Sequence, residues 1–458
     1  MEKKVIEYIE NNHLRYLEEL KSFLRIPSVS TEKLHHKDIQ AAAEFIAEQL
    51  KQAEIGKVEI FPTNGHPVVY GEFIAGSDKP TVLIYGHYDV QPADPIELWE
   101  SHPFNPTIRG GELYARGAAD DKGQLFIHVK SAEAYLQTMG KIPVNVKYLI
   151  EGEEEIGSAH LEDFIKDNQE LLKADVVMIS DTAMFARNVP SLCYGLRGMA
   201  YFQIDLQGAN TDLHSGSFGG AVVNPAFELS RILAAMKDGK GRILIPHFYD
   251  TVRDISNREV REFKRLPFDE KTYMQELGVT ELPGEEGYAT LERLWSRPTF
   301  EVNGLLSGFT GEGAKTVIPS KAMAKVSMRL VPDQNPEKIG DLFEKHVQSQ
   351  APPSVSVTVT CMSVGLPWVA SLNSPALVAA AVAIQKGFGE KPVFQREGGS
   401  IPIVATFAER FGIPSVLMGI GLPDENAHAP NEKLNLGNFY AGIKSSAYFL
   451  DEFSRTSV

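Results

Sequence analysis

The chain has 458 residues, a net charge of −15 at pH 7 and 43% hydrophobic residues. This length exceeds what one hydrophobic core usually spans, so we expect two domains. The acidic balance argues against nucleic acid and anionic membranes as partners, because both are bound through clustered Lys and Arg.

The two cysteines, Cys193 and Cys361, are too few for a disulfide framework or a thiolate zinc site. We therefore interpret them as thiols in a reducing compartment. Residues 1–23 mix charged and apolar residues at helical spacing and lack the apolar core of a signal peptide. No apolar stretch is long enough to span a bilayer. These features predict a cytoplasmic protein.

Four short runs rich in apolar residues predict strands buried on both faces: Thr81–Tyr85, Val144–Ile150, Ala174–Ile179 and Ser415–Ile420. Between them, apolar residues repeat along one face of a predicted amphipathic helix, at Leu125, Val129, Ala132, Leu136 and Met139. Strands that alternate with helices predict an α/β fold, with a mostly parallel sheet flanked by helices.

The middle of the chain has a different pattern. Alternating strands are predicted at residues 199–207, 322–330 and 355–360, with amphipathic helices at 225–237 and 336–350. These elements predict a small α+β module with helices on one face of an antiparallel sheet. Residues 239–303 are charged, contain four prolines and receive no predicted structure. We expect one domain, formed by residues 1–194 and 369–458, interrupted by a second at 195–368.

Acidic residues and histidines follow the predicted buried strands. His87 and Asp89 follow the first, Glu153–Glu155 the second and Asp181 the third, and His428 lies in the loop after the last. The carboxyl ends of parallel strands meet at one edge of a sheet, where ligands bind. Asp120 and Asp121 precede the predicted helix.

Each of these features alone has a structural explanation. A single histidine is usually a hydrogen-bonded structural residue, three consecutive acids are usually a solvated turn, and Asp120-Asp121 suits a helix N-cap. As a set, they fit better as ligands of two divalent ions with mixed nitrogen and oxygen donors. The proposed ligands are His87, Asp120, Glu155, Asp181 and His428. Asp89 lies two residues after His87, so it can orient that imidazole.

Nine motifs occur in order along nearly the whole chain: GHYDVQP, YARGAADDKG, EGEEEIGS, ISDT, HSG, GAKTVIP, RLVPDQ, REGGSIP and NAHAPNE. Together they resemble the dinuclear-zinc metallopeptidase family of carnosinases, cytosolic nonspecific dipeptidases, glutamate carboxypeptidases and aminoacylases. The similarity is closest to the nonspecific dipeptidases. The resemblance implies a catalytic α/β domain (1–194 and 369–458) and a smaller α+β lid domain (195–368) through which a homodimer forms.

The resemblance also implies roles for particular residues. Asp120 would bridge two zinc ions, with manganese or cobalt as alternatives, and the Asp120–Asp121 peptide would be cis. Glu154 would be the general base that activates a water bridging the two ions, and Asp89 would orient His87. Glu153 departs from the dipeptidase pattern, which has an uncharged residue there. The positions of base and ligand could therefore shift by one residue.

Four further residues are implied as substrate contacts: His214, Thr316, Arg329 and Ser400. In the family the histidine reaches the active site of the partner subunit; the sequence does not decide between the same subunit and the partner. The planar guanidinium of Arg329 suits bidentate capture of a carboxylate, although a surface ion pair is the commoner role of arginine.

The resulting hypothesis is metal-dependent hydrolysis of peptide bonds in dipeptides or short peptides with a free C-terminal carboxylate. An N-acyl amino acid deacylase or a carboxypeptidase would use the same metal core and stays open as an alternative. A phosphoesterase would add Lys or Arg at the strand ends, and none is convincing. Gly308–Thr316 superficially suggests a phosphate-binding loop, but Ala314 stands where that loop needs glycine.

Overall fold

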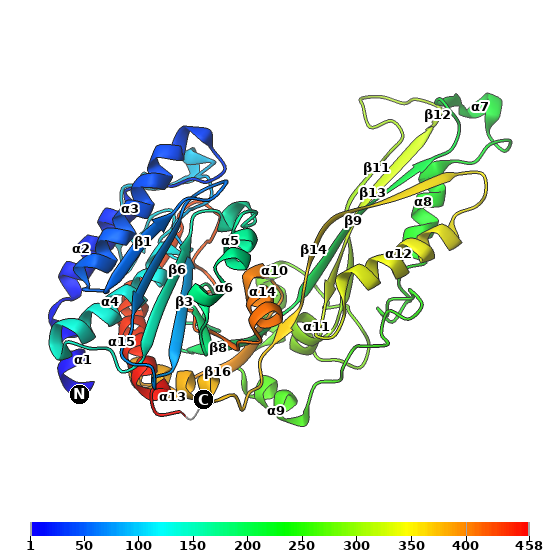
Figure 1. The fold of residues 1–458 in the computed structure, drawn as a ribbon. Helices are drawn as coiled ribbons and strands as arrows, with labels where there is room; N and C mark the ends of the chain where they lie inside the picture. Colours follow the sequence, from blue (N-terminus) through cyan, green and yellow to red (C-terminus); the bar gives the residue numbers. More distant parts are fainter. Residues whose placement is uncertain (1, 400, 457–458) are drawn as a thin grey trace. The chain divides into compact units, whose positions relative to one another are not determined.

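The computed structural model describes residues 2–399 and 401–456 (Figure 1). The chain forms two compact units. The first comprises Met1–Tyr194, Ala370–Gln395 and Thr406–Val458, and the second comprises Gly195–Val369 and Arg396–Ala405. None of the helices in the described part of the chain combines the length and apolarity that a membrane crossing requires.

Most of a nine-stranded mixed sheet lies in the first unit; its order is β1-β2-β6-β3-β7-β17-β8-β15, with β16 beside β8, and β15 belongs to the second unit. The four central strands, β6, β3, β7 and β17, are parallel, whereas β1, β2, β8 and β15 pair antiparallel with their neighbours. The predicted α/β sheet is therefore confirmed, with its parallel part confined to the centre. The strands are β1 (Lys57–Phe61), β2 (Val68–Phe73), β3 (Thr81–His87), β6 (Asn145–Glu151), β7 (Val176–Ile179), β8 (Ser191–Leu196), β15 (Trp368–Val369), β16 (Val393–Glu397) and β17 (Ser415–Leu417).

Helices pack around this sheet: α3 contacts β1 and β2, α4 contacts β3, α13 contacts β17, and α15 contacts α4 and α13. The blue N-terminal helices in Figure 1 are α1, α2 and α3. The helices that include residues of this unit are α1 (Glu2–Asn11), α2 (His13–Leu24), α3 (His36–Gln52), α4 (Lys122–Met139), α5 (Leu161–Asp167), α6 (Gln169–Leu172), α13 (Pro375–Phe388), α14 (Pro402–Phe411) and α15 (Leu436–Phe453).

Helix α4 corrects one expectation. The sequence predicts an amphipathic helix, but residues Lys122–Leu136 are all buried, because α1, α2, α3, α15 and β3 surround the helix. Its polar side chains are satisfied internally: the imidazole of His128 lies 2.8 Å from Ser180 Oγ and 2.9 Å from Ser446 Oγ. The helix ends at Met139 and is followed by Gly140, whose φ of 62° suits glycine.

A small second sheet in the first unit brings two distant segments together. Its order is β18-β5-β4, and Lys433 pairs with Tyr114. The loop that follows β5 and the loop that precedes β18 therefore lie side by side. The strands are β4 (Thr107–Arg109), β5 (Glu112–Tyr114) and β18 (Lys433–Asn435).

The second unit contains an antiparallel four-stranded sheet in the order β11-β13-β9-β14. Residues alternate between buried and half-buried along β9 and β13, and the buried side chains form a core with residues of α8 and α12. The predicted α+β module is therefore present. Its main elements are β9 (Gly198–Gln207), α8 (Pro225–Ala234), β11 (Thr299–Ser307), β13 (Lys321–Leu330), α12 (Pro336–Gln350) and β14 (Ser356–Gly365).

Residues 239–303, left without a predicted structure, contain three helices and the start of β11. The helices are α9 (Asn257–Arg265), α10 (Glu270–Leu277) and α11 (Thr290–Ser296). Helix α9 begins with a capping box between Ser256 and Glu259, a local signal that the sequence contains. A short strand pair in the same unit consists of β10 (Leu213–His214) and β12 (Val317–Ile318).

The buried imidazole of His128 generates a prediction about stability. Burial lowers the pKa of His128 to about 3, whereas histidine in an unfolded chain titrates near pH 6.5. The unfolded state therefore binds a proton that the folded state excludes, and His128 destabilises the fold progressively as the pH falls below about 6.5. The cost is up to about 1.4 kcal/mol per pH unit.

We expect His128→Gln to remove this contribution. Urea unfolding of the chelator-treated chain at pH 7, 6 and 5 should give a smaller loss of stability on acidification for the variant than for the wild type. Identical pH dependence in the two chains would contradict this explanation.

Candidate metal centre

The structure brings all five predicted ligands together in the first unit. His87 ends β3, Glu155 lies in the turn after β6, and Asp181 follows β7. Asp120 lies just before α4, and His428 lies in the loop between β17 and β18. Backbone topology explains the gathering, because the parallel strands β3, β6 and β7 end at the same edge of the sheet.

The ligand atoms form two groups that share one residue. His87, Asp120 and Asp181 form one group, and Asp120, Glu155 and His428 form the other; within each, one donor atom per residue lies within 4.8 Å of the others. Asp120 Oδ1 is 3.1 Å from His87 Nε2, and Asp120 Oδ2 is 2.8 Å from His428 Nε2. Each oxygen of Asp120 thus faces a different imidazole.

Contacts at Nδ1 fix the orientation of the His87 imidazole. Its Nδ1 lies 3.1 Å from the main-chain oxygen of Asp89 and 3.4 Å from that residue's Oδ1. A carbonyl oxygen can only accept, so Nδ1 carries a proton and Nε2 faces the cluster. Burial alone would lower the pKa of His87, but contacts with Asp120 and Asp89 raise it well above its usual value. Asp89 lies where the sequence predicted an orienting carboxylate, although its main-chain oxygen makes the closer contact.

The three consecutive glutamates have different surroundings. Glu153 is buried and accepts a hydrogen bond from His66 N at 3.0 Å, and one of its oxygens lies 2.9 Å from His160 Nδ1. Glu155 Oε2 lies 3.2 Å from His428 Nε2. Glu153 therefore serves loop contacts, whereas Glu155 lies among the predicted ligands.

Asp89 also anchors this acidic turn. Its carboxylate accepts from Glu154 N at 3.3 Å and from Glu155 N at 3.1 Å. Gln91 Nε2 donates to Glu155 Oε2 at 2.8 Å. The residues after β3 therefore orient both His87 and the glutamates after β6.

The acids of the cluster have pKa values shifted in different directions. Burial, followed by repulsion from Asp120, raises the pKa of Asp181 well above its usual value. Burial also raises the pKa of Glu154 to about 7, with the nearby acids Glu155 and Asp120 adding to the shift and His87 opposing it. Asp120 differs: burial alone would raise its pKa, but the neighbouring imidazoles of His428 and His87 lower it.

The donor set fits divalent cations on two observations. Imidazole nitrogens and carboxylate oxygens are the ligands that borderline divalent ions prefer. In addition, His87 Nε2 and Glu155 Oε1 are buried and make no well-aligned hydrogen bond among the described residues. Buried polar atoms normally have a partner, so these atoms point to a group that the protein side chains do not supply.

The Asp120–Asp121 peptide is cis, as the resemblance implied. Asp121 occupies the N-cap position of α4, but its side chain makes no capping hydrogen bond. Its Oδ2 instead accepts from His87 N at 3.3 Å. The residue therefore contacts the strand that carries a predicted ligand.

Three of the predicted substrate contacts lie in the second unit. His214 and Thr316 are exposed, and His214 Nε2 lies 3.5 Å from Thr316 Oγ1. His214 Nδ1 accepts from Gly216 N and Ser217 N, so Nε2 carries the proton of the neutral ring. Arg329 is half-buried in β13. The fourth predicted contact, Ser400, lies outside the described residues.

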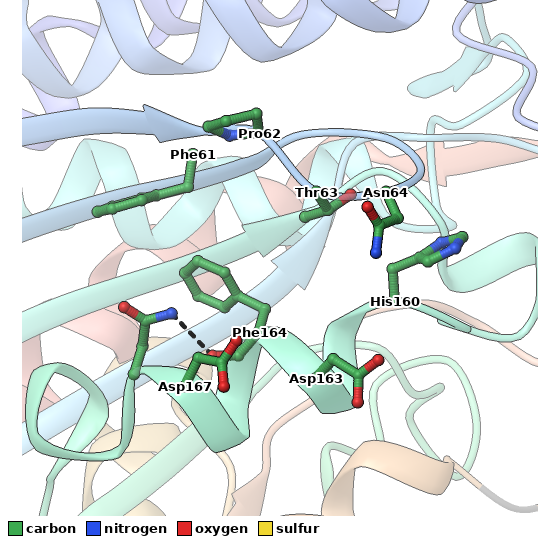
Figure 2. Close-up of a pocket in the computed structure, with 9 residues that line it drawn as sticks. Phe61, Pro62, Thr63, Asn64, His160, Asp163, Phe164 and Asp167 are labelled. Carbon is green, nitrogen blue, oxygen red and sulfur yellow. Dashed lines mark hydrogen bonds between the residues drawn. The ribbon is translucent and has the colours of Figure 1, made fainter.

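A pocket of about 440 Å³ lies in the first unit beside the ring of His160. Figure 2 shows Phe61 and Phe164 on one side and Asp163 and Asp167 below. None of the five predicted metal ligands lines it. The cavity is therefore distinct from the metal centre, although Glu153 links His160 to the acidic turn.

The sequence reasoning missed two residues that support the centre. Gln91 lies in the motif GHYDVQP and Glu432 ends the motif NAHAPNE, so both stood in recognised segments. No local pattern marks either side chain, because their contacts are made with segments distant in the chain. Only the tertiary structure places them beside the predicted ligands.

Comparison with known proteins identifies the family. A family profile described as Peptidase family M20/M25/M40 matches residues 83–452. The Cys-Gly metallodipeptidase DUG1 of Candida albicans is 33% identical over 470 residues, covering 98% of this chain and 97% of that protein. The human Beta-Ala-His dipeptidase is 31% identical over 469 residues, covering 99% of this chain and 92% of that protein.

Among solved structures, the M20 family metallo-carboxypeptidase Sso-CP2 from Sulfolobus solfataricus matches with a TM-score of 0.84 and 36% identity, covering 96% of this chain and 99% of that one. These findings confirm the family resemblance drawn from the nine motifs. The profile spans most of the chain and two relatives exceed 30% identity over nearly their whole length, so the protein belongs to peptidase family M20/M25/M40.

Proposed function

We propose that the chain hydrolyses the peptide bond of dipeptides or short peptides that have a free C-terminal carboxylate, and that it does so with bound metal ions. The observation that carries this proposal is the pair of donor groups that share Asp120. The relatives support the substrate class, because two of them are named as dipeptidases and match this chain almost end to end.

The centre would hold two divalent ions, for which zinc is our proposal and manganese or cobalt the alternatives. His87 and Asp181 would hold one ion, Glu155 and His428 the other, and Asp120 both. Three carboxylates offset most of the charge of two dications, so the ions can be buried without a large uncompensated charge. Bound divalent ions act as Lewis acids, polarising the peptide carbonyl and increasing the acidity of water.

Glu154 would act as the general base. Burial holds its pKa at about 7 in the absence of metal, so the carboxyl can both accept and release a proton near neutral pH. It would take a proton from the attacking water and deliver it to the departing amine. Asp89 supports this role, since its carboxylate binds the main-chain N–H of Glu154.

We further propose that residues 1–194 and 369–458 form the catalytic domain and residues 195–368 the lid, through which a homodimer forms. His214 would donate from Nε2 to the developing oxyanion, and Thr316, Arg329 and Ser400 would contact the substrate. The proton on His214 Nε2 supports the first role, because a donor is needed there. We place the protein in the cytoplasm.

A carboxypeptidase is the second candidate, because the Sulfolobus solfataricus relative carries that name and is 36% identical. An N-acyl amino acid deacylase is less favoured, since the dipeptidase names accompany the longest matches. Turnover of an unblocked dipeptide, an N-acylated dipeptide and an N-acylated amino acid by the same preparation would separate the three activities. A dipeptidase should prefer the unblocked dipeptide.

The shared position of Asp120 predicts the metal content of a variant. Asp120→Asn should bind fewer than two metal ions per chain, because a neutral amide offers one weak oxygen donor where the carboxylate offers two. Metal analysis after dialysis measures this number directly. Asp163→Asn, which removes an exposed acid from α5, is the matched control and should keep the wild-type content. Equal contents in the two variants would remove Asp120 from the bridging position.

If Glu154 is the general base, its replacement should reduce turnover without loss of bound metal. Glu154→Gln should lower kcat by roughly 10²–10⁴-fold, the usual contribution of a general base, while metal content stays at the wild-type value. Glu153→Gln is the matched control, since its carboxylate serves His66 and His160. A greater loss of kcat in the Glu153 variant would transfer the role of base to that residue.

If Arg329 binds the substrate carboxylate, its replacement should affect mainly peptides with a free C-terminus. A hydrogen bond to a charged group contributes about 1.5–3 kcal/mol, so Arg329→Ala should lower kcat/KM for a dipeptide by roughly 10- to 150-fold. The C-terminally amidated dipeptide should lose much less, and Arg329→Lys should restore only part of the activity. Proportional losses on both substrates would show that Arg329 does not bind the carboxylate.

A further inference from the structure

The carboxylate of Glu432 accepts hydrogen bonds from several donors of a single loop. It is fully buried, with 0% of its surface exposed. Oε1 accepts from Ala119 N at 2.9 Å and from Asp120 N at 3.1 Å. Oε2 accepts from Gly117 N at 2.9 Å and from Arg116 Nη1 at 2.8 Å. All four donors belong to residues 116–120.

The buried cation of this arrangement is itself held in place. Arg116 is 1% exposed, and its Nη2 donates to Pro92 O at 3.0 Å. Its main-chain N–H donates to Pro103 O at 2.9 Å. The guanidinium therefore offsets the charge of Glu432 and connects it to the segment that follows β3, which carries Asp89 and Gln91.

Glu432 lies in the same loop as His428, four residues further along. The β18–β5 pairing begins at Lys433, directly after Glu432, and Ala115 N donates to Glu432 O at 3.1 Å. The side chain thus joins the loop that carries His428 to the loop that carries Asp120. These are the two predicted ligands whose donor atoms lie 2.8 Å apart.

We propose that Glu432 is a positioning residue for the metal centre: it fixes the backbone of Asp120 relative to His428 so that the shared carboxylate can serve both metal groups. This inference rests on the proposed metal-dependent function. Glu432 would contact neither metal nor substrate, and would act through the main-chain N–H of Asp120. Residues that orient a ligand in this way typically change metal affinity or activity by roughly 10- to 100-fold when replaced.

Replacement of Glu432 by glutamine tests the hydrogen bonds of the carboxylate directly. Glutamine keeps the length and volume of Glu432 but converts one oxygen into a donor, so two of the four donors lose their acceptor. The loop would either lose the N–H contacts of Ala119 and Asp120 or those of Gly117 and Arg116. In both cases Asp120 is held less firmly, and the effect should appear in metal binding before any substrate is added.

The experiment compares Glu432→Gln with Glu133→Gln. Glu133 is a suitable control because its carboxylate is also buried and paired, with Lys130 Nζ at 2.9 Å, but it lies in α4 and contacts no predicted ligand. Each chain is stripped with a chelator, titrated with Zn²⁺ against a competing chelator, and loaded with Co²⁺ for its visible absorption spectrum. Thermal unfolding of each stripped chain reports the structural cost.

We expect Glu432→Gln to weaken Zn²⁺ binding by roughly 10- to 100-fold and to change the Co²⁺ spectrum. Glu133→Gln should keep the wild-type affinity and spectrum even if its unfolding temperature falls as far. Wild-type affinity and spectrum in Glu432→Gln, or an equal loss of affinity in both variants, would overturn the proposal.

If Glu432→Gln does not fold, Glu432→Asp decides the matter in the same way, because the shorter carboxylate keeps the charge but cannot reach both pairs of donors. A wild-type chain that binds no Zn²⁺ would instead refute the proposed function itself. The two failures are therefore distinguishable.

Discussion

Asp120 presents one carboxylate oxygen to the imidazole of His87 and the other to that of His428, and the other predicted ligands of the first unit gather around that position. Asp181 and Glu155 bring two further carboxylates to the same place. Burial raises the pKa of Asp181, and repulsion between acids held so close adds to the shift. Hydrogen bonds hold Asp120 and Glu155 in place despite this repulsion, through Asp120 N to Glu432, Glu155 N to Asp89 and Gln91 to Glu155 Oε2. Bound cations would offset the charge that remains.

The sequence could predict that the five proposed ligands lie together because each stands next to a recognisable feature. His87 and Asp181 come directly after short apolar runs, and the edge of a parallel sheet brings such positions together whatever the connecting segments do. The distinction between Glu153, Glu154 and Glu155 could not be made in this way. It depends on His66 and His160, whose positions relative to the turn follow from packing.

Other features were missed for equally physical reasons. The apolar stripe of α4 predicts one buried face, but a helix surrounded by other helices buries its polar side as well. Strand β11 is mostly exposed and lacks the alternation of its neighbour β13, so periodicity does not reveal it. Glu432 and Ala119 are 313 residues apart in the chain. Their contact depends on the pairing of β18 with β5, which no local pattern encodes.

The buried pair of Arg116 and Glu432 also has to be explained energetically. Removing two charges from water costs several kcal/mol per ion, and the attraction between them often does no more than offset that cost. A buried ion pair by itself therefore contributes little to stability. Here Glu432 accepts three backbone N–H groups as well, in a loop where the main chain must stay at a defined distance from His428.

An apolar residue at position 432 would leave those three N–H groups buried without partners, each at a cost of about 1–3 kcal/mol. A neutral acceptor such as glutamine could serve only some of them. A carboxylate meets the geometric demand because it offers two oxygens with about four acceptor positions, and Arg116 is then required to offset its charge. The ion pair follows from the need to hold Asp120, and its location beside the metal centre is a consequence of the same need.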